Sequence, residues 1–173
     1  MRSWEEKING ETEEKKMNRQ ADFTDGSSSF DDGFDKLYEK IKTMYRDDEL
    51  ETVKRAYETA KEHHKNQLRQ SGEPYIIHPI AVAGILADLG MDSQSVAAAL
   101  LHDTVEDTDV TKADIERDFG DEIAQLVDGV TKLAKVPTET KAEAQAENIR
   151  KMLLAMSNDI RVIIIKLADR LHN

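Results

Sequence analysis

The sequence predicts an all-α domain, and three observations carry that prediction. Apolar residues recur at intervals of three and four along most of the chain, which is the pattern of helices with one buried face. The 173 residues include only 8 glycines and 3 prolines, about half of their usual combined share of ~12%. The one stretch with strand propensity, residues 162–165, has no partner strand elsewhere, and a lone strand leaves its backbone groups unpaired.

The first 30 residues differ in composition from the rest of the chain. A few scattered apolar residues stand there among Glu, Lys, Asn and a run of serines, and such low hydrophobicity is typical of disorder. We therefore expect a disordered acidic tail over residues 1–30 and a folded domain over residues 31–173.

Two helices open the predicted domain. Apolar residues with helical spacing run through residues 34–45, which predicts the first helix. The second is longer and more polar, with Asp47 or Asp48 as its N-cap. It breaks at residues 71–74, where a glycine and a proline lie two positions apart.

The next two helices form the expected core. Proline follows His78, and proline is favoured at the first position of a helix, so His78 should lie at or beside the N-cap. Gly90 is well placed to end that helix. Asp92 or Ser93 then begins a helix whose residues 97–101 are all apolar, as expected for the centre of a bundle.

The remaining elements are also predicted to be helical. Thr111–Asp114 resembles a capping box, and the short helix after it should stop at Gly120. Further helices are expected over residues 123–130 and 138–156. The final segment combines strand-like Val-Ile-Ile-Ile with no partner strand, so we predict a buried helix capped by Asp159.

Composition excludes several classes of function. The formal net charge is -11, which disfavours a nucleic-acid groove, because binding to polyanions depends on lysine and arginine. No apolar run approaches the ~18 residues that a membrane span needs. The chain has no cysteine and no signal-peptide pattern at its start, so a cytoplasmic location is the expectation. An anionic ligand would need a local reversal of the acidic field.

Polar residues in apolar surroundings mark the candidate site. His102–Asp103 ends the most apolar helix, and Glu106–Asp107 follows one turn later, on the same face if the helix persists. Asp169 lies among isoleucines and leucines, and His78 stands at a helix start. Two histidines and two aspartates are a plausible set of ligands for a divalent metal. Taken singly, each has an ordinary alternative, such as a capping or core histidine, or an ion pair of Asp169 with Arg170 or Arg150.

The order of these residues resembles the metal-binding signature of the HD phosphohydrolase superfamily. The strings SGEPYIIHP, LLHDTVEDT and KLADRLHN narrow the resemblance to the N-terminal hydrolase domain of the RelA/SpoT family of bifunctional alarmone enzymes. It extends from about Phe34 to the last residue.

This resemblance implies an all-helical bundle that uses manganese, Mn²⁺, to remove the 3′-pyrophosphate from guanosine tetra- and pentaphosphate. The implied metal ligands are His78, His102, Asp103 and Asp169. Glu106 and Asp107 would orient or deprotonate the attacking water. Arg69 would lie against the guanine or its phosphates, and Ser71 and Asn173 would help to complete the nucleotide pocket.

The chain departs from the family pattern in three places. Gln70 replaces the usual basic residue after Arg69, and Asn66 replaces a common glycine. The family sequence continues past Asn173 into further helices of the bundle, so we expect an incomplete domain with an uncovered apolar face over residues 163–171 that is available for self-association.

Two alternatives to the alarmone hydrolase stay open. One is a catalytically impaired fragment that acts only by binding a partner. The other is a phosphohydrolase for a different nucleotide, such as NADPH. Synthetase activity is not expected, because it needs a separate domain.

Overall fold

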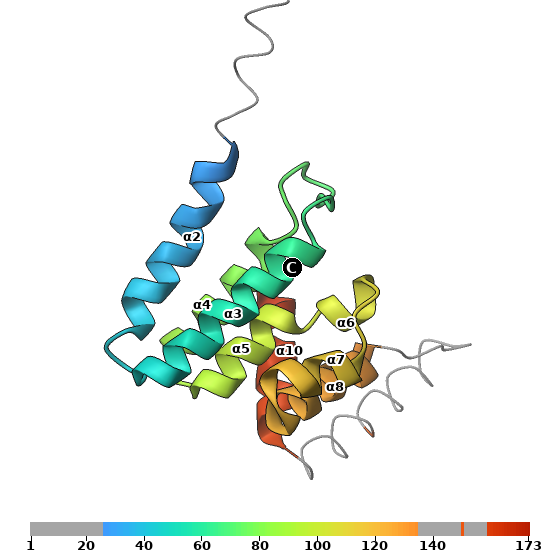
Figure 1. Ribbon diagram of the computed structural model, residues 1–173. Helices are drawn as coiled ribbons and strands as arrows, with labels where there is room; N and C mark the ends of the chain where they lie inside the picture. The colour runs from blue at the N-terminus through green and yellow to red at the C-terminus, as the bar shows by residue number, and fades with distance from the viewer. Residues whose placement is uncertain (1–25, 135–149, 151–158) are drawn as a thin grey trace, which may run out of the picture. The chain divides into compact units, whose positions relative to one another are not determined.

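The computed structural model describes residues 26–134, 150 and 159–173. The chain divides into two compact units, Met1–Asp32 and Gly33–Asn173, and the features below belong to the second, apart from the first residues of α2. The described residues contain no strand, only an isolated bridge between Leu68 and Pro74. The helices, labelled in Figure 1, are α2 (Gly26–Ile41), α3 (Asp47–His63), α4 (Ile77–Asp88), α5 (Ser93–Leu101), α6 (Thr104–Asp107), α7 (Lys112–Phe119), α8 (Asp121–Ala134) and α10 (Ile160–His172).

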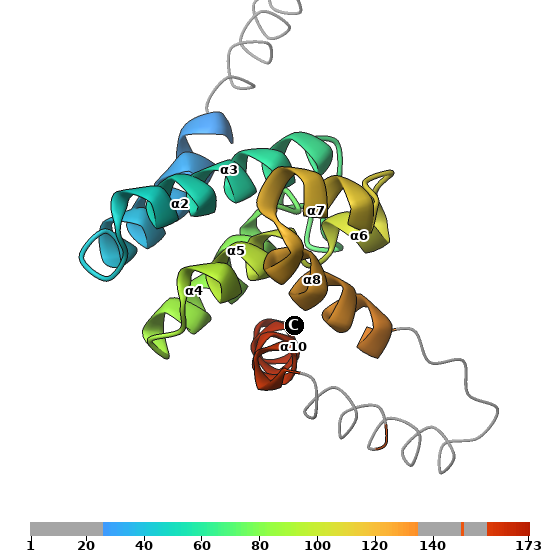
Figure 2. The same cartoon turned by 60° about the horizontal axis from the view of Figure 1, so that its bottom comes forward.

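Helix α5 is the centre of this bundle, as its apolar composition predicts. Each residue from Val96 to Leu101 is fully buried, and α5 packs against α3, α4, α8 and α10. Figure 2 looks along α10, which lies beside α4 and α8. The residues that follow α5 are thereby held where α4, α5 and α10 meet.

Local capping explains most of the helix ends. The Asp92 side chain accepts a hydrogen bond from the backbone of Ser95 and begins α5. Thr111 and Asp114 form the predicted capping box of α7, and Asp159 caps α10. Gly90, with φ of 69°, follows the end of α4 in the left-handed conformation that glycine adopts without strain.

Several boundaries differ from the prediction. The N-cap of α3 is Arg46, so Asp47 and Asp48, either of which was predicted to cap it, are the first two residues of the helix. α4 begins at Ile77, so Pro79 is its third residue, a position whose N–H would also lack a partner within the helix. α3 ends at His63, before the predicted break. The chain then forms a tight loop in which the Arg69 N–H donates to the Glu73 carbonyl and Gly72 takes a φ of 86°.

Two predicted segments fall mainly outside the described residues. Residues 1–25 of the predicted tail and the helix expected over residues 138–156 are among those not described. Residues 26–30, which the prediction assigned to the tail, form the beginning of α2. No helix among the described residues has the length and apolar character needed to cross a bilayer.

Helix α10 buries one apolar face and leaves a second apolar stripe exposed. Val162, Ile163 and Ile165 are buried in contacts of the helix with α4, α5 and α8. The expectation of an uncovered apolar face over residues 163–171 is confirmed in part, because Ile164, Leu167 and Leu171 follow Ile160 at helical spacing and form a stripe that is at least partly exposed. Leu167 and Leu171 remain exposed, by 55% and 76%, and self-association through them stays a prediction.

Candidate metal centre

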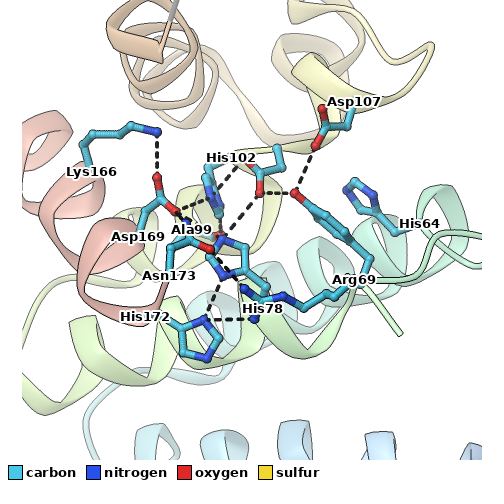
Figure 3. Close-up of polar contacts among 12 residues, drawn as sticks. His64, Arg69, His78, Ala99, His102, Asp107, Lys166, Asp169, His172 and Asn173 are labelled. Atoms are coloured by element: carbon cyan, nitrogen blue, oxygen red, sulfur yellow. Dashed lines mark hydrogen bonds and ion pairs between the residues drawn. The ribbon is translucent and has the colours of Figure 1, made fainter. Parts of the chain in front are cut away.

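Three helices bring His78, His102 and Asp169 together. His78 is the second residue of α4, His102 follows the last residue of α5, and Asp169 lies in the last turns of α10. All three are buried, and one potential ligand atom from each lies within 4.8 Å of the others. Figure 3 shows the three side chains pointing toward one another.

Asp103 joins the same cluster. Its Oδ1 is 3.1 Å from Nε2 of His102, and its Oδ2 is 3.6 Å from Nε2 of His78. The Nε2 atom of His78 also lies 3.2 Å from Oδ1 of Asp169. The structure therefore gathers the four residues that the sequence predicted as metal ligands, with both imidazole Nε2 atoms facing carboxylate oxygens.

The tautomer of His102 is fixed by the backbone of its own helix. Its Nδ1 lies 2.7 Å from the Ala99 carbonyl oxygen, which can only accept, so Nδ1 carries a proton. The opposite atom, Nε2, is buried without a hydrogen-bond partner in the described structure. In the neutral ring this Nε2 presents a lone pair to the oxygens of Asp103 and Asp169. A lone pair that faces carboxylates is stabilised by a positive charge between them, which either a proton on Nε2 or a metal ion can supply.

The cluster is also strongly anionic. Burial alone would raise the pKa of Asp169, but its interactions with His78 and Lys166 outweigh burial and lower it. Asp103 behaves in the same way, since contacts with His102 overcome burial and lower its pKa. Burial would lower the pKa of His102, yet its contacts with Asp103 raise it. Both carboxylates thus stay ionised and draw positive charge into the centre.

These residues fit a divalent metal. Nitrogen and oxygen ligands of such ions bind at about 2.0–2.2 Å, so ligands on opposite sides of one ion stand up to about 4.4 Å apart, close to the 4.8 Å limit of this cluster. Imidazole and carboxylate ligands together suit first-row divalent ions. The hydrogen bond from His102 to a backbone carbonyl is the usual outer support of a metal-binding histidine.

The acidic pair Glu106 and Asp107 lies on a separate short helix. The chain turns after His102, and α6 begins at Thr104, so the helix of the apolar core does not persist as the sequence argument required. Asp107 connects to the cluster through Tyr75, whose hydroxyl is 2.7 Å from Asp103 Oδ2 and 3.0 Å from Asp107 Oδ2. Glu106, the residue before Asp107, is exposed.

Two of the three predicted nucleotide contacts reach the cluster. Arg69 donates to Oδ1 of Asn173 at 3.0 Å, and Nδ2 of Asn173 donates to Asp169 at 2.6 Å. Ser71 lies in the same loop as Arg69, but it is exposed and its hydroxyl donates to Glu73. The structure therefore connects Arg69 and Asn173 to the cluster, whereas Ser71 makes its contact within its own loop.

Two residues of the centre were missed by the sequence argument. Lys166 donates to Asp169 Oδ2 at 2.6 Å, so the partner of Asp169 is this lysine and not the neighbouring Arg170, which was one alternative. His172 places its Nδ1 2.9 Å from Nδ1 of His78. The sequence spacing is a weak indication of both contacts, because Lys166 lies three residues before Asp169 and His172 three residues after it, on the same face of the helix.

Comparison with known proteins agrees with this geometry. The model of the HD domain matches residues 56–173. The bifunctional (p)ppGpp synthase/hydrolase SpoT of Escherichia coli is 52% identical over 140 residues, which are 81% of this chain and 20% of that protein. The guanosine-3′,5′-bis(diphosphate) 3′-pyrophosphohydrolase of Vibrio cholerae has the same identity and coverage. The chain thus spans about a fifth of the length of these curated relatives.

A solved structure is similar as well. It is a metazoan ortholog of SpoT, described as hydrolysing ppGpp and acting in starvation responses. The TM-score is 0.57 at 32% identity, over 70% of this chain and 67% of that one.

Proposed function

Because the chain belongs to the HD-domain family, a family of metal-dependent hydrolases, we propose that it hydrolyses the 3′-pyrophosphate of guanosine tetra- and pentaphosphate (ppGpp and pppGpp). The observation that carries the proposal is the convergence of His78, His102, Asp103 and Asp169, beside an arginine on the adjoining loop. The relatives named as pyrophosphohydrolases support this activity over a role restricted to binding a partner. The location that we propose is the cytoplasm.

The four clustered residues would hold one divalent cation, which we propose to be Mn²⁺. When bound, such an ion polarises a phosphoryl oxygen and lowers the pKa of a coordinated water. The residues supply two neutral imidazoles and two carboxylates, which leaves the centre close to neutral once the ion is present. His78 and His102 are held from two different helices, so their orientation is set by the packing of α4 on α5.

Asp107 and Glu106 would act as the base of the reaction. The attacking water loses a proton to one of these carboxylates as its oxygen forms a bond to phosphorus. The bond from that phosphorus to the ribose 3′-oxygen breaks, and the 3′-oxygen takes up a proton, which yields guanosine di- or triphosphate and pyrophosphate. The Tyr75 hydroxyl fixes the position of Asp107 relative to the metal ligand Asp103. A carboxylate placed in this way contributes about 10²–10⁴-fold to a rate.

Arg69 would bind the substrate. The chain as a whole has a net charge of -11, which repels a polyphosphate, so positive charge is needed at the site itself. The Arg69 guanidinium and the bound cation supply that charge locally. Asn173, whose amide lies between Arg69 and Asp169, and Ser71 in the loop would complete the pocket.

A nucleotide panel tests the substrate assignment. The purified chain with Mn²⁺ is incubated separately with ppGpp, pppGpp and NADPH, and products are resolved by ion-exchange chromatography. We expect pyrophosphate together with GDP or GTP from the first two nucleotides, and no product from NADPH. Hydrolysis of NADPH alone would reassign the substrate to the other class.

A variant pair tests the base. Glu106→Ala and Asp107→Ala should each lower the rate while leaving Mn²⁺ affinity intact, because neither is among the proposed ligands. Glu51→Ala, an exposed acid on α3, serves as the control and should keep the wild-type rate. Full activity in both Glu106→Ala and Asp107→Ala would show that the base lies elsewhere.

A further inference from the structure

His172 makes an unusual contact with one of the clustered histidines. The Nδ1 atoms of His78 and His172 are 2.9 Å apart, and Figure 3 shows the two rings meeting on the side of His78 that faces away from Asp169. Two neutral imidazoles can share such a contact only if one nitrogen carries the proton and the other accepts it. The contact therefore specifies two tautomers at once, and a third residue decides which pair is present.

Arg69 determines which of the two nitrogens carries the proton. Its Nη1 lies 3.4 Å from the same Nδ1 of His172, and a guanidinium is always a donor. Nδ1 of His172 must then be the acceptor for both neighbours, so the proton between the two histidines belongs to Nδ1 of His78.

The consequence lies on the opposite side of the His78 ring. With its proton on Nδ1, neutral His78 presents a lone pair at Nε2, and that atom is 3.2 Å from Asp169 and 3.6 Å from Asp103. We propose that His172 is a positioning residue, which, held by Arg69, fixes His78 in the tautomer that directs Nε2 to the metal. The inference rests on the proposed metal centre, and it assigns to His172 the task that the Ala99 carbonyl performs for His102.

The end of α10 thus connects Arg69 to two ligands of the centre. His172 orients His78, and Asn173 donates to Asp169 while it accepts from Arg69. A nucleotide that engages Arg69 would act on the same contacts that hold the ligands in place. Outer contacts of this kind change metal affinity by about 10–100-fold when they are removed.

The test is Mn²⁺ affinity in the absence of nucleotide, measured by electron paramagnetic resonance of the unbound ion. His172→Leu removes the acceptor, and His172→Asn keeps one, because the amide oxygen can accept from both His78 and Arg69. We expect affinity to fall by about 10–100-fold in His172→Leu and to be largely retained in His172→Asn. Leu171→Ala, an exposed neighbour, is the control for the integrity of the helix end, and circular dichroism melting verifies the fold of each variant.

Two results would overturn the inference: wild-type affinity in His172→Leu, or an equal loss in both His172 variants, which would mean that the imidazole merely fills space. The test of His172 can be distinguished from the test of the proposed hydrolysis. A wild-type chain that binds Mn²⁺ but leaves ppGpp intact would reject the reaction, and the expected loss of affinity in His172→Leu would still support the role of His172. A wild-type chain that binds no Mn²⁺ would reject both.

Discussion

At the residue scale, Tyr75 places one hydroxyl between two carboxylates. The oxygen lies within 3.0 Å of both Asp103 and Asp107, and its single proton is what separates the two negative groups. Burial and both hydrogen bonds raise the pKa of Tyr75, so the hydroxyl stays protonated at neutral pH. Tyr75 thereby links the proposed metal ligands to the proposed base.

Tyr75→Phe removes that link while it keeps the ring. We expect hydrolysis of ppGpp to fall by about 10–100-fold, the usual effect of losing an outer contact at a metal centre. Steady-state kinetics with Mn²⁺ at saturation measure the change. Tyr38→Phe, on α2 outside the site, should leave the rate unchanged. Equal rates in both variants would contradict the role assigned to Tyr75.

Tyr45 gives a prediction for alkaline stability. Its hydroxyl donates to the Met91 carbonyl, and burial, aided by Asp92 and Glu49, raises its pKa to about 12 from 10.0. A pKa that is raised in the folded state adds stability at pH values below 10 and loses it as the pH rises toward 12. Wild type should thus be more stable than Tyr45→Phe at pH 8, and the difference should shrink between pH 10 and pH 12. Urea unfolding at each pH measures it, and a constant difference would contradict the pKa shift.

At the element scale, Gly129 of α8 lies directly against Val162 of α10. A Cβ placed on this residue would lie 2.8 Å from Cγ2 of Val162, and Val162 is buried and branched at Cβ, so it cannot turn away. Gly84 on α4 offers the opposite case, because a Cβ there meets no atom within 4 Å. The two glycines share a helical setting and differ in the space around them.

Alanine at these two positions should therefore change stability in opposite directions. Gly129→Ala should lower the free energy of unfolding, since overpacking costs about 1–3 kcal/mol and exceeds the gain in helix propensity. Gly84→Ala should raise it by about 0.4–1 kcal/mol. Chemical unfolding of both variants measures the signs. A stabilised Gly129→Ala chain would show that α8 and α10 have room to separate.

Helix ends were predictable wherever a single residue decides them. Asp92, Thr111 and Asp159 act as caps through their own side chains, so the local sequence was sufficient. The early end of α3 was not predictable in this way. There the ring of His64 is buried and stacks on Tyr75 at 4.7 Å, a contact between residues whose proximity only the folded loop creates.

The same distinction applies to the candidate site. His78, His102 and Asp169 were recognisable because polar groups in apolar segments need partners. His172 carries no such signal, since a histidine near the end of a helix is ordinary. Lys166 does stand between Ile165 and Leu167, but a lysine three residues from an aspartate is typical of an ordinary helical ion pair. Their roles depend on which way their side chains turn once α10 lies against α4 and α8.

At the scale of the whole molecule, the acidic net charge of -11 and the buried carboxylates both favour binding of a cation. An ion that binds only the folded chain stabilises it by about 2.7 kcal/mol when present at 100 times its Kd. For a domain of this size that corresponds to a rise in Tm of about 5–10 °C. Scanning calorimetry with Mn²⁺ should show the rise, and a chelator should reverse it. Asp169→Asn should respond little, and an undiminished response there would place the ion elsewhere.

The central claim, a metal-dependent hydrolase for the 3′-pyrophosphate of guanosine nucleotides, is tested most directly by pyrophosphate release from ppGpp. The purified chain is assayed with Mn²⁺, with chelator, and as Asp103→Asn, whose fold is verified by circular dichroism. The account predicts steady release of pyrophosphate and GDP in equal amounts, abolished by the chelator and severely reduced in Asp103→Asn. Release that continues with chelator, or no release from a folded chain that has bound Mn²⁺, would contradict it.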